Sequence, residues 1–82
     1  FRSCNMENAK LKKANLYKAD LWGANLTNAD LSYSNLTHAR LDKANLTNAD
    51  LSHSYLNASL KDVIMDGANI KHADYGAVIR EI

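Results

Sequence analysis

ANLYKADLWGANLTNADL, the stretch from residue 14 to residue 31, repeats a unit of five residues. In each unit Ala is followed by Asn or Asp, then by Leu, and then by two variable residues. We call these five places the small, polar and central positions and the first and second bend positions. The central residue recurs every five residues from Met6 to Leu56, so the repeat covers most of the chain. A repeat of this regularity determines the architecture and is interpreted before any other feature.

The period of five excludes both ordinary secondary structures. On an α-helix, successive leucines would step about 140° around the axis, because each residue turns about 100°. On a flat strand, successive leucines would alternate between the two faces, because five is odd. Within one unit, however, the small and central residues lie two apart and share a face. The pattern therefore predicts a short extended stretch with both residues inward, followed by a bend, so that the chain winds.

A longer echo indicates the number of sides in one coil. Residues 25–34 (NLTNADLSYS) return as residues 45–54 (NLTNADLSHS), with nine of ten positions identical at an offset of twenty. Residues stacked on neighbouring coils share an environment, so this offset predicts four five-residue sides per coil. A recent duplication would leave the same echo, and the periodicity alone does not separate the two explanations.

The units Ala14-Asn15-Leu16, Ala19-Asp20-Leu21, Ala24-Asn25-Leu26 and Ala29-Asp30-Leu31 resemble the pentapeptide repeat family, whose consensus is A(D/N)LXX. The resemblance implies an all-β fold, a right-handed, four-sided parallel β-helix with about four coils of 20 residues. The right hand agrees with the general rule for parallel crossovers. The small and central residues then form the core, which we expect to include Ala14, Leu16, Ala19, Leu21, Ala24, Leu26, Ala29, Leu31, Leu36, Leu41, Leu46, Leu51 and Leu56.

The phase of the repeat changes once. Leu56 is followed by Leu60 rather than by a central residue at position 61, so one residue is missing. A slip of one would turn inward residues outward, and we therefore expect an irregular corner near Asn57. Gly67 and Gly76 follow the slip, where bends that need a positive φ favour glycine. We divide the single domain, residues 1–82, into regular repeats over 1–56, a phase slip over 57–60, second-phase repeats over 58–77 and an irregular cap over 78–82.

The composition excludes several classes of protein. Ten Lys and Arg stand against nine Asp and Glu, and the net charge of +1 gives no strong field toward nucleic acid or acidic membranes. No apolar run approaches the roughly 20 residues of a membrane span. The single cysteine, Cys4, occupies a small inward position, so we expect a buried, unreactive thiol. No phosphate-cradling glycine loop or nucleophile motif is present, and we predict neither an enzyme nor a bound cofactor.

Outward-facing aromatic residues are the candidates for an interaction surface. By their place in the unit, Tyr17, Trp22, Tyr33 and Tyr55 point outward, and large aromatics are frequent anchors of protein interfaces. The alternative for Trp22 is an internal cation–π contact with Arg2, which lies twenty residues before it.

Two histidines are the candidates for a metal site. His53 and His72 fall in one column with Tyr33 and are expected to stack on adjacent coils. Two imidazoles can share a metal ion, but a third ligand is wanted and none is evident, so we predict no metal site. Alternating charges, such as Asp20 beside Arg40, indicate ladder pairs on a solvated surface.

Three functions are compatible with such a rod to different degrees. The first is a non-catalytic structural or protein–protein interaction module that presents flat β faces, and the resemblance supports it because most members of the family have no known biochemical activity. The second is a DNA-mimic inhibitor of DNA gyrase, as some relatives are. That function implies an acidic rod that dimerises at its C-terminal ends, which the charge of +1 and the short length disfavour. The third is nucleic-acid binding through Lys10, Lys12, Lys13 and Lys18, which occupy different sides of the coil.

The ends of the chain bear on its partners. Phe1 already falls at a central position, so we expect the chain to be a piece of a longer protein. An uncapped solenoid end exposes backbone and apolar edge, and we expect another protein or a flanking domain to cover it. Membrane contact is not expected, nucleic acid is disfavoured and a monomer is favoured. With no signal peptide or membrane span in the sequence, the cytoplasm is the favoured compartment.

Overall fold

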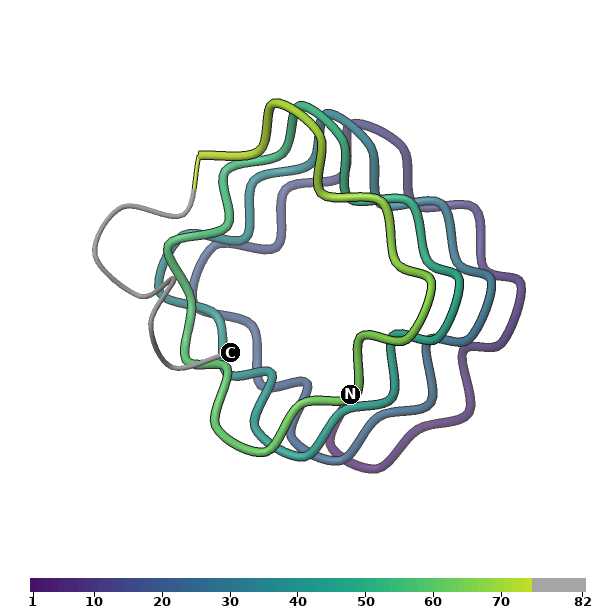
Figure 1. The fold of residues 1–82 in the computed structure, drawn as a ribbon. Coiled ribbons are helices and arrows are strands. Elements are labelled where there is room, and N and C mark those ends of the chain that lie inside the picture. The colour runs from purple at the N-terminus through teal and green to yellow at the C-terminus, as the bar shows by residue number, and fades with distance from the viewer. Residues whose placement is uncertain (75–82) are drawn as a thin grey trace.

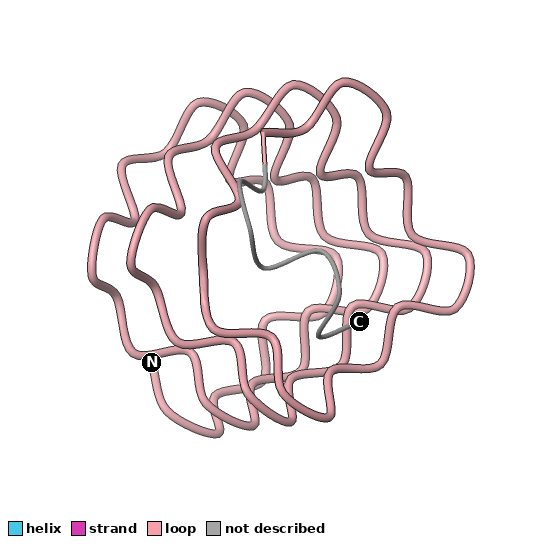
Figure 2. Ribbon diagram, turned by 60° about the vertical axis from the view of Figure 1, so that its left-hand side comes forward, coloured by secondary structure: helices cyan, strands magenta, loops and turns pink. Residues whose placement is uncertain are grey.

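The computed structural model of the protein describes residues 1–74. Over these residues the backbone forms neither a helix nor an extended strand. It consists of tight turns joined by isolated parallel β-bridges, and the path is drawn as loop throughout in Figure 2. In this part of the chain no helix is long and apolar enough to cross a membrane.

Four ladders of bridges define four sides. At first each bridge joins residues twenty apart, so the residues at the polar positions stack from coil to coil. Seen along the axis in Figure 1, the chain turns anticlockwise as it comes toward the viewer, which is a right-handed winding. The architecture is therefore a right-handed, four-sided parallel β-helix, as the family resemblance implies. The stacked residues are Asn5, Asn25, Asn45 and Ile64; Lys10, Asp30, Asp50 and Asn69; Asn15, Asn35, Tyr55 and Asp74; and Asp20, Arg40 and Ser59.

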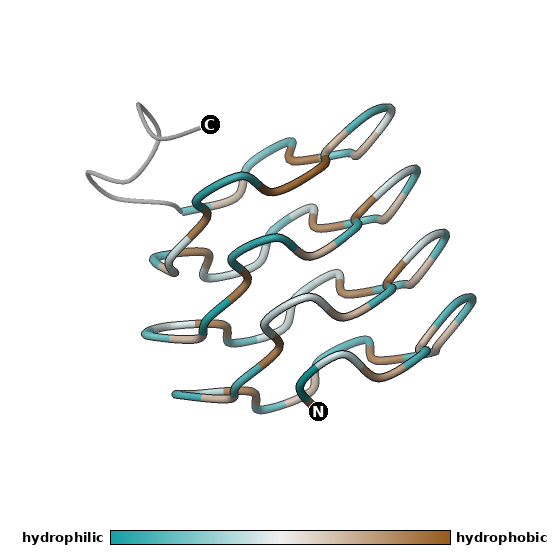
Figure 3. Ribbon diagram, turned by 90° about the horizontal axis from the view of Figure 1, so that it is seen from below, coloured by the Kyte–Doolittle hydropathy of each residue, from teal (hydrophilic) through white to brown (hydrophobic). Residues whose placement is uncertain are grey.

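The central residues fill the interior. From Leu21 to Leu60, every central leucine has 0% of its surface exposed, and Leu16 has 7%. The small residues from Ala24 to Ala58 are at most 3% exposed. Figure 3 shows the apolar segments recurring at the same places in successive coils. Burying one leucine contributes about 1.5–3 kcal/mol, so this column is the main source of stability.

Three residues that were predicted to be buried lie nearer the surface. Ala14 and Ala19 are only partly buried, although both pack against the core cluster. Cys4 is exposed, so the prediction of a buried thiol is wrong. All three belong to the first coil, which has a described coil on one side only. In the first coil, an inward position is therefore open to solvent on the side that has no neighbouring coil.

The hydrogen bonds of one unit explain the consensus. In residues 29–33, the N–H of Asp30 donates to the preceding coil and those of Leu31 and Tyr33 donate to the following coil, with N···O distances of 2.7–3.0 Å. The N–H of Ala29 closes the preceding turn at 3.0 Å. The remaining donor, Ser32 N–H, is bound by Oδ1 of Asp30 at 3.0 Å. The polar position is Asn or Asp because its side chain supplies the one acceptor that the backbone lacks.

The same cap recurs around the solenoid. Oδ1 accepts the N–H two residues further on, at 2.9–3.2 Å, in Asn5, Asn15, Asp20, Asn25, Asn35, Asn45, Asp50 and Asn69. At Thr27 and Thr47 the hydroxyl group also donates to the same oxygen, at 2.7 and 2.5 Å. The recurring Asn or Asp was visible in the sequence, but its capping role was missed.

Every regular corner has a residue with positive φ. The second bend residue has a φ between 57° and 72°, and twelve of these residues are not glycine. Positive φ therefore belongs to the regular corners in general, and not to Gly67 and its second-phase neighbours alone. Each turn is closed by a backbone N–H that donates to the carbonyl three residues before it. A turn of this type needs a positive φ at the third of its four residues, which is the second bend position. No β-branched residue occupies the position among residues 1–74, in keeping with the steric cost of branching at positive φ. Gly76 and the cap expected over 78–82 lie outside the described residues.

The corner after Leu56 is one residue shorter than the others. Ala58 N–H donates to Leu56 O at 2.8 Å, two residues back rather than three. From Ser59 onward the bridges join residues nineteen apart. The residue that is missing is the one with positive φ, and Leu60 still enters the core with 0% of its surface exposed.

A neighbouring coil stabilises the turn that follows this corner. Its polar position holds Ser59, which does not cap its own turn. The Asp42 carboxylate accepts instead, from the Ser59 hydroxyl group and from Lys61 N–H at 3.2 Å. The slip is thus accommodated by a shorter corner and by a cap supplied from the coil beside it.

Candidate protein-interaction face

One side of the solenoid carries three of the four candidate aromatic residues. We call it the tyrosine face, and it is formed by residues 13–18, 33–38, 53–57 and 72–74. Tyr17 lies at a first bend position, Tyr33 at a corner and Tyr55 in the ladder itself. Their exposed fractions are 49%, 51% and 58%. Tyrosine combines a large apolar ring with a polar tip, so three half-exposed rings on one side form a candidate contact surface.

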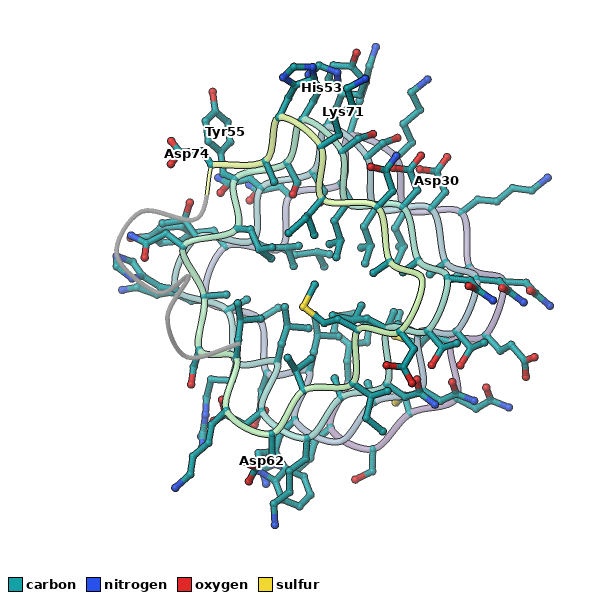
Figure 4. All side chains as sticks on the ribbon, viewed as in Figure 1. Asp30, His53, Tyr55, Asp62, Lys71 and Asp74 are labelled. Carbon is teal, nitrogen blue, oxygen red and sulfur yellow. The ribbon has the colours of Figure 1, made fainter. Side chains whose placement is uncertain are left out.

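One corner of the tyrosine face is an aromatic column. Tyr33 stacks on His53 with ring centroids 4.7 Å apart and planes at 9°, and His53 stacks on His72 at 4.9 Å and 26°. The predicted stack is confirmed. The ring spacing matches the roughly 4.7–4.9 Å between paired strands, so the backbone register holds the rings together. In Figure 4, His53 points away from the interior at this corner.

Two lysines lie against the tyrosine rings. Lys12 Nζ is 5.7 Å from the centroid of Tyr33, and Lys18 Nζ is 5.4 Å from that of Tyr17. His38 meets the Tyr17 ring edge-on, with centroids 5.6 Å apart. These are cation–π distances, so each ring holds an ammonium group at the border of the face.

Tyr55 is the most exposed of the three tyrosines. It lies in the ladder between Asn35 and Asp74, and Figure 4 shows Tyr55 and Asp74 projecting outward beside each other. Within residues 1–74 no aromatic or cationic group stacks on its ring. Tyr55 therefore presents the freest ring surface on this face.

Trp22 belongs to the adjacent side and is engaged within the protein. The Arg2 guanidinium lies 5.0 Å and the Lys43 ammonium 5.6 Å from its ring centroid. Arg2 is itself fixed by Asp20, with Nε 3.1 Å from Oδ2. The internal cation–π contact predicted for Trp22 is confirmed, and the structure does not bring Trp22 together with the three tyrosines.

Two carboxyl groups, those of Asp20 and Asp30, have pKa values below the ordinary value. The N–H of Trp22 lowers the pKa of Asp20 below its ordinary value, with Arg2 and Arg40 acting in the same direction against a partial desolvation. The Ser32 hydroxyl and N–H groups lower the pKa of Asp30, and the Lys12 charge adds to the effect. Asp20 and Arg40 are neighbours in one ladder, as the charge pattern predicted, but the ion pair found for the Asp20 carboxylate in residues 1–74 is with Arg2.

The opposite side has a different outer surface. We call it the asparagine face, formed by residues 3–8, 23–28, 43–48 and 62–67. Asn5, Asn25 and Asn45 stack in its ladder, and the Asn25 amide donates to Asn5 Oδ1 at 3.4 Å. It carries no aromatic residue.

Comparison with known proteins assigns the family. A family model described as "Pentapeptide repeat region" matches residues 1–75. The chain is a pentapeptide repeat protein. A search of curated proteins finds none that matches.

Two solved structures share the fold. A pentapeptide repeat protein from the thylakoid lumen of Arabidopsis thaliana is 32% identical, with a TM-score of 0.58, over 87% of this chain and 47% of that one. A pentapeptide repeat protein from the cyanobacterium Cyanothece is 23% identical, with a TM-score of 0.51, over 79% of this chain and 58% of that one. The present chain thus spans about half the length of either protein.

No metal-binding constellation is found in the described part of this pentapeptide repeat protein. Residues 1–74 contain no group of three or more His, Cys, Asp or Glu side chains placed to hold a metal ion. The buried hydroxyl groups of Ser34 and Ser54 are satisfied by the carbonyls three residues before them, at 2.6 and 2.7 Å. Every buried side-chain polar atom described has a hydrogen-bond partner. The candidate site is the exposed tyrosine face.

Proposed function

We propose that this pentapeptide repeat protein is a non-catalytic protein–protein interaction module that uses the tyrosine face as its contact surface. The observation that carries the proposal is the gathering of Tyr17, Tyr33 and Tyr55, each about half exposed, on one side of a rigid coil. Aromatic side chains anchor interfaces because they bury much area for little loss of side-chain entropy.

The scaffold supports this role. The tyrosines project from coils whose backbone groups are paired and whose leucines from Leu21 onward are fully enclosed, so the surface is preorganised and little ordering is needed on binding. The rest of the face is polar and uncharged in its middle, with Asn15, Asn35 and Thr37. Such a mixture of tyrosine and neutral polar groups is typical of protein-recognition surfaces.

The finer points of the fold belong to the same proposal. The chain forms one domain of about four coils. It acts as a monomer, and another protein or a flanking domain covers an end. The cytoplasm stays the predicted compartment, although one similar structure is that of a thylakoid-lumen protein.

Site-specific photo-crosslinking tests the contact surface. p-Benzoylphenylalanine replaces Tyr55 or, as a control, Ile64, which occupies the same position in the ladder of the asparagine face and is 46% exposed. Partners crosslinked in cells are identified by mass spectrometry, purified and bound to the uncrosslinked protein. We expect a defined partner at position 55 that is absent at position 64.

Substitutions in the tyrosine face then test the same complex. Tyr17→Ser, Tyr33→Asn and Tyr55→Asn together should weaken binding of the purified partner at least tenfold. The control Thr27→Ser, Thr47→Ser and Ile64→Asn should leave binding unchanged. Equal crosslinking at both positions, or full binding by the triple tyrosine variant, would overturn the proposal.

A further inference from the structure

We propose that the partner of the tyrosine face is an acidic polypeptide segment, with its carboxylates over the first coil and its less charged part over Tyr55. This inference rests on the proposed function. The observation that supports it is the placement of the lysines, whereas the proposed function rests on the tyrosines.

The lysines lie at the two corners of the face. Lys13 and Lys18 are the second bend residues on either side of Asn15 and Tyr17, with φ of 64° and 61°. Both are exposed, and neither makes an ion pair within residues 1–74. In its first coil the face therefore consists of a neutral centre between two unneutralised ammonium groups.

A third ammonium group belongs to the same surface through its ring contact. The Nζ atom of Lys12 lies 5.7 Å from the ring centroid of Tyr33, on the next coil. The Nζ atom of Lys18 lies 5.4 Å from the ring centroid of Tyr17, its neighbour in the sequence. Of these lysines, only Lys12 faces a carboxylate in the described structure, that of Asp30, whose pKa it helps to lower. A cation held beside an aromatic ring loses less freedom when it pairs with an incoming anion, because the ring already restricts it.

The charge of the coils is distributed along the axis. Residues 1–20 contain five Lys or Arg and two Asp or Glu, a net +3, whereas residues 21–74 contain four and six, a net −2. Within the described residues of the tyrosine face, the one carboxylate is Asp74, in the last coil. An acidic segment is therefore attracted to the first coil and is less favoured near the other end.

The asparagine face would not accept the same ligand. It carries Glu7, Asp62 and Asp66 against one Lys43, a net charge of −2. The two opposite sides of one solenoid thus differ by charge as well as by aromatic content. Discrimination between them follows from repulsion on one side and attraction on the other.

A polypeptide fits better than a nucleic acid. Single strands bind by stacking bases on open aromatic faces. The Tyr33 ring is already covered by His53 and Lys12, and the Tyr17 ring is covered by Lys18. The free ring is that of Tyr55, and around it Asn35 and Asn57 offer amide groups suited to a peptide backbone.

Fluorescence anisotropy with a fluorescein-labelled ten-residue peptide of Glu and Asp with one central Leu tests the inference. We expect saturable binding that weakens about threefold or more between 50 and 200 mM NaCl, because exposed charges are screened. Lys13→Asn with Lys18→Asn should weaken binding about fivefold, as expected for the loss of two exposed ion pairs. Asn is chosen because it tolerates positive φ.

The matched control removes the same charge elsewhere. Lys43→Asn with Lys61→Gln lowers the net charge equally, and Lys43 has the same backbone conformation with φ of 60°. The double variant Lys43→Asn with Lys61→Gln should change the affinity for the peptide by less than about twofold, because salt screens charges that lie away from the tyrosine face. Equal losses in both double variants would show binding to net charge alone and would overturn the inference.

Two further outcomes separate the possibilities. Tighter binding of a ten-residue oligothymidylate than of the acidic peptide would assign the face to nucleic acid. A partner crosslinked at position 55 that is insensitive to salt and to the Lys13 and Lys18 substitutions, but is lost in the triple tyrosine variant, would overturn the acidic partner alone. If the triple tyrosine variant still binds both the acidic peptide and the crosslinked partner, the proposed function and the acidic partner are both overturned.

Discussion

The tyrosine face and the asparagine face are two opposite sides of the same coils. Behind each, the central leucines are fully enclosed, as Leu36 and Leu26 show, and at their corners the backbone has the same positive φ. The faces differ mainly in their outward residues, although the small inward position holds Ser34 and Ser54 on the tyrosine face and Ala24 and Ala44 on the asparagine face. The comparison teaches that the inward residues and the caps specify the fold, whereas the outward positions are free to specify a contact.

The two faces also differ in how firmly their turns are capped. On the asparagine face, Asn25 and Asn45 each accept an N–H and a threonine hydroxyl group. On the tyrosine face, Asn35 accepts the Thr37 N–H alone, and Tyr55 replaces the capping residue altogether. Each face also lacks the capping residue once, at Tyr55 and at Ile64, so the additional threonine contacts are what distinguish the asparagine face.

The largest expected effect tests whether the two faces share one core. Leu36→Ala and Leu26→Ala should each lower the free energy of unfolding by about 2–5 kcal/mol, because each leaves a cavity that a solenoid of paired coils cannot close. Urea unfolding followed by circular dichroism measures both. If either substitution lowers the free energy of unfolding by less than about 1 kcal/mol, the face in front of that leucine does not share the common core.

A smaller effect is expected at the corner that ends the asparagine face. Gly67 has a φ of 72°, and a Cβ there would overlap Asn48 Oδ1. Gly67→Ala should cost about 1–2 kcal/mol from the backbone alone, and more if the Asn48 amide cannot turn away. The corners of the tyrosine face carry the non-glycine residues Tyr33 and His53 at φ of 59° and 57°.

Gly23→Ala is the matched control for this corner. Its φ is 67°, and the nearest atom to an added Cβ is Ser3 Oγ at 3.3 Å. The difference between the two glycine variants in thermal unfolding isolates the overlap with Asn48. Adding Asn48→Gly to Gly67→Ala should recover that difference, and no recovery would assign the whole cost to the backbone.

Much of this fold was predictable because one rule repeats. The inward leucines follow from the period of five. The four sides were indicated by the twenty-residue echo together with the family resemblance, and with four sides in-register coils place Tyr33, His53 and His72 one above another. The capping by Asn45 and its equivalents did not follow, because the period fixes where a residue lies but not which N–H lacks an acceptor. The exposure of Cys4 was missed because an inward position in the first coil is covered by a neighbouring coil on one side only.

The candidate face was predictable only in part. The sequence assigns Tyr17, Trp22, Tyr33 and Tyr55 outward positions, but the ladder decides which of them share a side. The lysine contacts of Tyr17 and Tyr33 depend on side-chain torsions that no period determines. Trp22 was separated from the tyrosines by its contacts with Arg2 and Lys43, of which the sequence had indicated only the first.

The difference in capping gives a third prediction. Asn45→Ala should cost about 1–2 kcal/mol, because it leaves two donors of Thr47 without an acceptor, whereas Asn35→Ala should cost about 0.5–1 kcal/mol. Both are measured by urea unfolding. Thr47→Val in the Asn45→Ala background should add little, since its hydroxyl partner is already gone. Equal costs at the two asparagines would remove the distinction between the faces.

The smallest effect has the opposite sign and concerns Tyr55. Tyr55→Asn restores a capping oxygen for the N–H of Asn57 and should stabilise the protein by about 0.5–1 kcal/mol, because the exposed tyrosine ring contributes little to the core. Tyr55→Ala, which removes the ring without adding an acceptor, is the control and should change stability by less than about 0.5 kcal/mol. A gain in thermal stability for Asn but not for Ala, together with weaker partner binding in both, would show that the tyrosine is kept at the expense of a cap. If Asn stabilises no more than Ala, the shortened corner after Leu56 already leaves Asn57 N–H well solvated, and the presence of Tyr55 costs the fold nothing.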